Sequence, residues 1–153
     1  IYLKNAGFKG ELSYFIDKEN IKNSISFSSS IDYSIKNGFY FLGSYLYNSN
    51  GLNESNFLSL ININANVLSP KNLMPSKHSY LLQVSKPITP PLNSSLNILY
   101  GQGIKLLYIS PTFSYDINSS LDAGIITQFF FLDNFGDFKN LLKGYYLQLK
   151  YSF

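Results

Sequence analysis

The chain has 153 residues, of which only 14% are charged and 17% are aromatic. A soluble domain normally carries about a quarter charged residues, and no apolar run here approaches the roughly 18–20 residues of a membrane helix. The lysines are scattered, the net charge is only +3 and there is no Arg or Cys, so the composition argues against a nucleic-acid partner and excludes disulfides and thiolate metal sites.

Alternating apolar and polar residues predict three strands in the first third of the chain. The first runs from Ala6 to Ile16, and the polar segment 17–20 ends it. The second, Ser24 to Ile35, alternates Ser or Asp with Ile, Phe or Tyr, an order that helical periodicity does not produce. The turn 36–38 contains Asn-Gly, which favours a tight hairpin, and a third strand over 39–47 follows.

The longest interruption is residues 48–77. Within it, residues 56–67 fit either a strand or a helix, because both periodicities place apolar residues on one side there. We interpret 48–77 as a loop with some structure of its own.

Five further strands are predicted in the second half. Each shows alternation, and each is separated from the next by Pro, Gly, Asn or Ser. Pro cannot continue a central ladder, so the fourth strand is expected to end before the Pro-rich turn. The predicted strands are 79–85, 96–100, 107–115, 121–131 and 145–153, with turns at 87–91, 101–103 and 116–120 and a loop at 132–143.

The last strand carries a distinctive pattern. Its aromatic and aliphatic residues share one side, and the chain ends on Phe; these residues are Tyr145, Leu147, Leu149, Tyr151 and Phe153. This strand resembles the terminal assembly signal of bacterial outer-membrane β-barrels. Turn and aromatic motifs elsewhere are similar to the C-terminal part of uncharacterised porin-like barrels of Gram-negative bacteria: Tyr45-Leu46-Tyr47-Asn48, Leu68-Ser69-Pro70-Lys71, Pro87-Ile88-Thr89-Pro90, Ile109-Ser110-Pro111 and Phe135-Gly136-Asp137.

The resemblance implies an all-β fold, an antiparallel up-and-down transmembrane β-barrel with about eight strands present, formed by one domain over 1–153. It implies a place in the bacterial outer membrane with the C-terminus on the periplasmic side. Counting back from that end, the turns 116–120, 87–92 and 36–38 are periplasmic and the loops 132–143, 101–105, 48–77 and 17–23 are outside. Aromatic residues then form a girdle at each interface. A soluble sandwich with an aromatic core is the alternative.

The function expected from this fold is that of a passive channel or a scaffold subunit. The implied partners are membrane lipid and the barrel-assembly machinery, with other envelope subunits as further candidates and no nucleic acid. Recognition of a surface partner through loop 48–77 is an alternative function. We expect no enzyme activity, no cofactor and no metal site. The competing hypothesis is a lipid hydrolase built on Ser76 and His78, which share a strand face in the predicted register.

A set of charged and amide residues is expected to face the barrel lumen. Three of these carboxylates, Asp32, Asp116 and Asp122, are expected to cluster at the periplasmic ends of the strands. The candidates are Lys9, Glu11, Asp32, Asp116, Asp122, Gln128 and Lys150.

The small size of most inward residues, such as the serines of 24–34, predicts that the chain is the C-terminal portion of a larger barrel, since eight strands leave a lumen only wide enough for side chains to fill. The start on Ile1 without a signal peptide fits upstream strands. The alternative is a lumen filled by large inward residues: Phe15, Tyr40, Tyr108, Phe130 and Tyr146.

Overall fold

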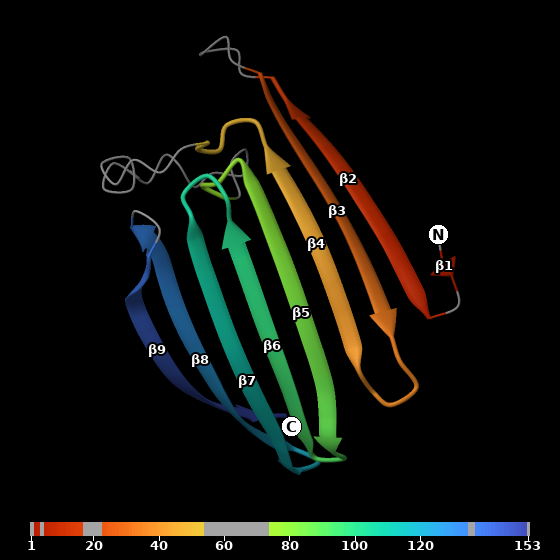
Figure 1. The fold of residues 1–153 in the computed structure, drawn as a ribbon. Helices are drawn as coiled ribbons and strands as arrows, with labels where there is room; N and C mark the ends of the chain where they lie inside the picture. Colours follow the sequence, from red (N-terminus) through yellow and green to blue (C-terminus); the bar gives the residue numbers. More distant parts are fainter. Residues whose placement is uncertain (1, 4, 17–22, 54–73, 135–136, 153) are drawn as a thin grey trace.

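A computed structural model describes residues 2–3, 5–16, 23–53, 74–134 and 137–152, and these form one antiparallel sheet (Figure 1). Nine strands lie in chain order, each paired with its sequence neighbours. They are β1 (Tyr2–Leu3), β2 (Ala6–Phe15), β3 (Ser24–Ser34), β4 (Tyr40–Asn48), β5 (His78–Thr89), β6 (Leu92–Gly101), β7 (Leu106–Asn118), β8 (Leu121–Asn134) and β9 (Asp137–Tyr151). The predicted all-β, up-and-down architecture with about eight strands is confirmed; the two-residue β1 is additional. No helix long and apolar enough to cross a membrane occurs among the described residues.

The connections between strands fall into two groups, one at each end of the sheet. The links β3–β4, β5–β6 and β7–β8 lie at one end of the sheet, which we call the short-turn end. The links β2–β3, β4–β5, β6–β7 and β8–β9 lie at the opposite end, the long-loop end. The Asn-Gly prediction is confirmed: Gly38 has φ +81°, and the Ile35 N–H donates to the Phe39 carbonyl at 2.8 Å across the turn.

The predicted end of the fourth strand before Pro87 is wrong. β5 continues through Pro87 to Thr89, and Pro87 pairs with Asn93 of β6. The ladder between β4 and β5 stops at Ser85, so no β4 residue needs the N–H that Pro87 lacks. Proline is therefore tolerated here, because one side of the strand has become an edge.

The predicted loop 132–143 is also wrong over most of its length. β8 extends to Asn134 and β9 begins at Asp137, so only 135–136 lie between the strands. Leu141 has no partner in β8, because Phe130 pairs with Leu142 and Phe131 with Asn140. This bulge shifts the apolar and polar alternation of β9 by one residue, so a prediction based on strict alternation does not recognise the first half of the strand.

The two faces of the sheet differ in chemistry. We call one the apolar face; it carries the cross-strand row Phe8, Ile31, Gly43, Leu82, Ile98, Ile109 and Phe129. We call the other the polar face; it carries the row Asp32, Leu42, Gln83, Asn97 and Ser110. In β3 the Ile, Phe and Tyr side chains of the apolar face are exposed while most polar-face side chains are half-buried, so the polar face lies on the inside of the curve.

No second layer formed by the described residues covers the apolar face. Ile31 is 58% exposed, Leu12 70% and Leu149 75%, and Ile104 is the only buried hydrophobic side chain among the described residues. A soluble domain seldom exposes a continuous apolar patch larger than a few hundred Å². This part of the chain therefore forms a sheet without a core of its own.

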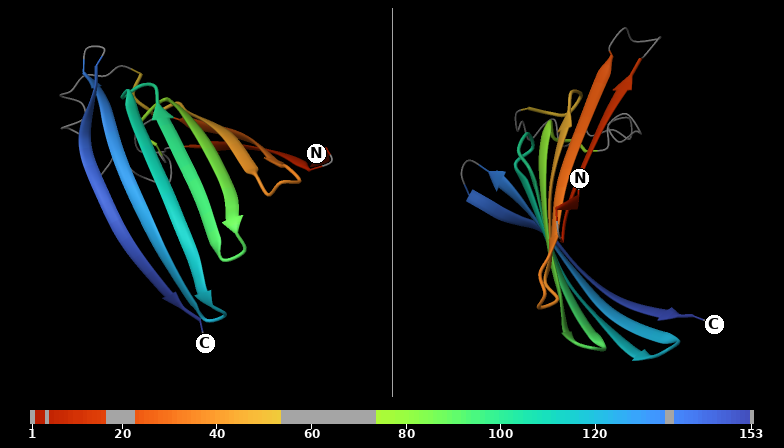
Figure 2. Two further views of the ribbon diagram at one scale, coloured as in Figure 1. Left: turned by 60° about the horizontal axis from the view of Figure 1, so that its bottom comes forward. Right: turned by 90° about the vertical axis from the view of Figure 1, so that its right-hand side faces the viewer.

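The sheet is open. Figure 2 shows it bent and twisted, with β9 at one edge and β2, flanked by β1, at the other. β2 pairs with β3 and, at Ala6 and Gly7, with β1; it does not pair with β9. The eight long strands therefore do not close on themselves.

The segment 48–77 is described only at its two ends, and the region 56–67 lies outside the described residues. Its base is fixed by backbone hydrogen bonds: the Leu52 N–H donates to the Pro75 carbonyl at 2.8 Å, and the Lys77 N–H to the Leu52 carbonyl at 3.0 Å. The buried Asn48 side chain donates to the Met74 carbonyl at 3.1 Å. The two ends of the segment are thus held together at the long-loop end.

Candidate functional site

The candidate site is the polar face at the short-turn end, where charges and hydroxyl groups gather. Three strands contribute one row, in which Asp116 of β7 stands opposite Asp122 of β8, and Asp122 opposite Lys150 of β9. The register of the two ladders produces this row, because alternate residues of each strand point to the same face. Residues 28 positions apart are thereby brought side by side.

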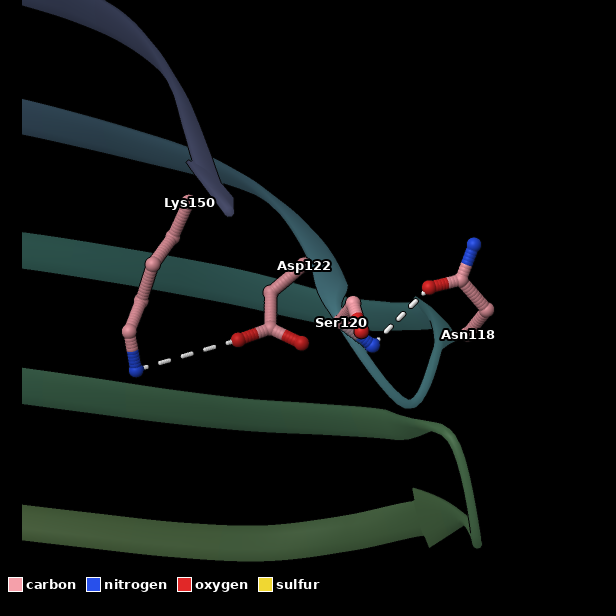
Figure 3. A network of polar contacts seen from close by, with 4 residues as sticks. All are labelled: Asn118, Ser120, Asp122 and Lys150. Carbon is pink, nitrogen blue, oxygen red and sulfur yellow. Dashed lines mark hydrogen bonds and ion pairs between the residues drawn. The ribbon is translucent and has the colours of Figure 1, made fainter. Parts of the chain in front are cut away.

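The ion pair in this row is loose. The Lys150 Nζ lies 3.9 Å from the Asp122 Oδ2 (Figure 3). The two side chains are 66% and 40% exposed. Such a pair contributes at most about 1 kcal/mol in water. Asp116 faces Asp122 directly, and like charges opposite one another destabilise a ladder. The row therefore keeps one more negative than positive charge, open to solvent.

The turn beside this row is ordered by its own polar groups. The Asn118 Oδ1 accepts a hydrogen bond from the Ser120 N–H at 2.9 Å (Figure 3), and the Ser152 N–H donates to the Ser120 carbonyl at 2.8 Å. An Asn side chain that captures the N–H two residues on is a common turn device. The turn thus holds the ends of β7, β8 and β9 in register next to the charged row.

Two shallow hollows border the row on this face. One, of about 190 Å³, is lined by Ser114, Asp116, Asp122, Ala123, Gly124, Gln148 and Lys150. The other, of about 170 Å³, is lined by Ser85, Lys86, Pro87, Asn93, Ser94, Ser95, Thr112 and Ser114. Ser114 belongs to both, so the hollows are neighbours. The resulting surface offers hydroxyl, amide and carboxylate groups to water.

The other predicted lumen candidates also lie on the polar face but farther along it. Lys9 and Glu11 belong to β2, Asp32 to β3 and Gln128 to β8. The predicted cluster of three carboxylates does not form, because β4, β5 and β6 separate Asp32 from Asp116. At about 4.8 Å per strand the separation is about 19 Å. Asp32 instead lies over Gly7, where an added Cβ would be 2.6 Å from its Oδ1.

The side chains of Ser76 and His78 are not hydrogen-bonded to each other. The Ser76 side chain is fully buried against Gly101, and its Oγ has no hydrogen-bond partner among the described residues. His78 lies on the apolar face, where its Nδ1 is 2.8 Å from the Tyr45 hydroxyl and its ring packs on Tyr47. The histidine is thus part of an aromatic cluster. No group of three metal-ligating side chains occurs in the described ranges.

Aromatic residues line both ends of the apolar face. At the long-loop end Tyr45 packs on Tyr80 with 5.4 Å between ring centroids, and Phe129 meets Tyr145 edge-on at 6.2 Å. At the short-turn end Phe39 stacks on Phe41 at 5.8 Å, and the Lys86 ammonium lies 4.5 Å from the Phe39 ring. These pairs add packing to a face that lacks a protein partner within the described residues.

The residues of the predicted assembly signal lie on the apolar face of β9, the edge strand. Leu147 is 85% exposed and Tyr145, Leu149 and Tyr151 are each at least 67% exposed. Phe153 lies outside the described residues. Next to this row, an apolar groove of about 380 Å³ runs over Ala123 between Phe113 and Leu147.

Sequence reasoning missed the residues that anchor the long-loop end. Asn48 belongs to the motif Tyr45-Leu46-Tyr47-Asn48, but nothing in the motif indicates that its side chain is buried and bonds across the base of segment 48–77. The 3.0 Å ion pair between Lys105 and Asp133 joins the β6–β7 turn to the end of β8. The two residues are 28 positions apart, so their spacing in the sequence does not predict the contact. Both contacts depend on the strand register.

Comparison of the chain with models of known protein families, with curated proteins and with solved structures gave no significant match.

Proposed function

We propose that this chain forms part of the wall of an outer-membrane β-barrel, with its apolar face against lipid and its polar face lining a water-filled passage. The observation that carries the proposal is the uncovered apolar face: exposed aliphatic and aromatic side chains fill it from β2 to β9, and the described residues bury a single hydrophobic side chain. In water such a face costs free energy in proportion to its area, whereas in lipid it costs none.

Strand length and the position of aromatic residues support the same function. A strand that crosses a bilayer needs about 9–11 residues, and β2 to β9 have between 9 and 15. Tyrosine and phenylalanine at both ends of the apolar face suit the two interfaces, where an apolar ring with a polar tip is favoured. With the long-loop end outside, the row of Asp116, Asp122 and Lys150 lies near the periplasmic mouth.

In this role the chain acts as a passive channel. The polar face offers hydrated hydroxyl, amide and carboxylate groups, and small polar solutes pass along it without a chemical step. The hydrolase hypothesis has no support in the geometry, because His78 contacts the Tyr45 hydroxyl and the Ser76 Oγ has no hydrogen-bond partner among the described residues.

The experiment that tests the membrane assignment uses Trp as a reporter, because the chain has none. Leu82 lies on the apolar face and its neighbour Leu81 on the polar face. In vesicles that contain brominated lipid, we expect Trp in Leu82→Trp to be strongly quenched and Trp in Leu81→Trp to respond instead to a water-soluble quencher. Equal quenching of the two variants by brominated lipid would refute the assignment.

The passage is tested separately by conductance across a planar bilayer. Thr112 points to the polar face and Phe113 to the apolar face. Modification of Thr112→Cys with a bulky water-soluble thiol reagent should lower the conductance, whereas Phe113→Cys should not react. A protein that inserts into lipid but conducts no ions would be a scaffold rather than a channel.

A further inference from the structure

Both edges of the sheet are unpaired over long stretches. β9 pairs only with β8, so its other side has no ladder partner among the described residues over 137–150. On the other edge, β1 covers only Ala6 and Gly7 of β2 and leaves Phe8 to Phe15 open. Backbone groups at a sheet edge need hydrogen-bond partners, and in lipid no water supplies them.

β1 is built like the other hairpin arms at the short-turn end. Leu3 pairs with Ala6 and Tyr2 with Gly7, both antiparallel, and the turn residue Asn5 has φ +73°. The Asn5 carbonyl accepts a hydrogen bond from the Ser34 N–H at 2.9 Å, which ties the turn to β3. Continued in the same register, a strand that ends at β1 runs along the open edge of β2.

The strand directions determine how such a sheet can close. Neighbours alternate in direction from β1 to β9, and because nine is odd, β1 and β9 run the same way. If β1 paired directly with β9, the seam would be parallel. Antiparallel closure therefore requires an odd number of additional strands, and nine strands plus one gives ten as the smallest ring. Bacterial single-chain barrels have even strand numbers.

We propose that the free edges of β2 and β9 pair with additional β-strands, odd in number, supplied by polypeptide that precedes Tyr2 in the same chain. The proposal rests on the proposed function, because only a barrel wall in lipid must close. The position of β1 indicates that the additional strands come from the same chain. β1 already lies along the edge of β2 that needs a partner, so polypeptide leading into β1 is aligned with that edge. Two copies inserted in the same direction and joined edge to edge would place β9 beside β1 of the next copy in a parallel pair.

The test uses the polypeptide as isolated from its native membrane, and it uses the lack of Cys in residues 1–153. A single Cys replaces Gln148 on β9, carries a short photoreactive thiol reagent, and the cross-linked peptides are identified by mass spectrometry. A mixture of isotopically light and heavy protein separates links within one chain from links between copies. The matched control is Leu82→Cys in central β5, which should link to peptides of β4 and β6.

We expect Gln148→Cys to link, within one chain, to a peptide that lies outside residues 1–153, and the intact mass to exceed the 17.4 kDa of these residues. A link to β2 of the same chain would mean that the eight long strands close alone. A link between light and heavy copies would make a second copy the partner. An intact mass of 17.4 kDa, or no link while the control reacts, would equally overturn the proposal. The quenching experiment on Leu82 and Leu81 is independent of all these outcomes, so failure of the membrane assignment is recognised separately.

Discussion

At the residue scale, the two faces predict opposite responses to an added charge. Ile31 is 58% exposed on the apolar face, close to the middle of β3, and Ser28 lies on the polar face opposite Glu11. Ile31→Lys should lower the free energy of unfolding in lipid vesicles by about 2–4 kcal/mol, the cost of a lysine at the bilayer midplane. Ser28→Lys should change it little, because the new charge faces water and Glu11. Equal losses in urea titrations of the two variants would mean that the faces are wrongly assigned.

The charged row predicts a small and salt-sensitive coupling. Lys150→Met removes the cation beside Asp122 and leaves Asp122 facing Asp116, so we expect a loss of less than about 1 kcal/mol in the free energy of unfolding. Asp116→Asn should raise the free energy of unfolding more in the Lys150→Met background than in the parent. Without Lys150 the repulsion between Asp116 and Asp122 is uncompensated, and Asp116→Asn removes it. In 1 M salt, where the screening length is about 3 Å, this coupling should vanish. A coupling that persists in 1 M salt would contradict a solvent-exposed row.

At the scale of the elements, the β3–β4 hairpin depends on one glycine. Gly38 has φ +81°, and a Cβ there would lie 3.0 Å from the Pro87 Cγ, so Gly38→Ala should cost about 1–2 kcal/mol in the free energy of unfolding. Gly10 is the matched control, since an added Cβ meets only the Ser28 carbonyl at 3.8 Å. Gly10→Ala should be neutral or slightly stabilising in the same denaturant titration. A Gly38→Ala variant as stable as the parent would show that the turn tolerates another conformation.

Strands that repeat strictly with period two were predictable from the sequence. β2, β3 and β4 lie within a residue of the predicted bounds, because alternation, serine spacing and the Asn-Gly turn all indicate the same register. The bounds of β5 and β9 were not predictable, because each depends on pairing with a neighbouring strand. Pro87 is compatible with a strand only where β4 has already ended, and the bulge at Leu141 shifts the pattern of β9. The residues that flank Pro87 and Leu141 indicate neither the end of β4 nor the bulge in β9.

The candidate site was predictable only in part. Alternation assigns Asp32, Asp116, Asp122 and Lys150 to one side of their strands, as the register has them. It does not give the distance across the sheet, which depends on how many strands lie between two residues. Asp116 and Asp122 meet because β7 and β8 are neighbours, and Asp32 stands apart because three strands intervene.

At the scale of the whole molecule, stability lies in one continuous ladder rather than in a core. Every long strand from β2 to β9 is hydrogen-bonded to the next, and the described residues bury only Ile104 as a hydrophobic side chain. A detergent such as SDS unfolds soluble proteins by entering their cores and coating the chain. In the proposed barrel, lipid or detergent chains already cover the apolar face, so the ladder, closed by the proposed additional strands, should survive in SDS at room temperature and separate only on heating.

The polypeptide isolated from membranes should therefore migrate in SDS electrophoresis at two positions: faster when loaded unheated, because the proposed barrel is compact when folded, and slower after boiling. A reducing agent should change neither position if the proposed additional strands, like residues 1–153, contain no Cys. Ile31→Lys should lower the temperature at which the fast band disappears, while Ser28→Lys should not, so that the gel also reports on the lipid face. A single position at all temperatures, together with release of the protein from membranes by alkaline extraction, would contradict the barrel wall.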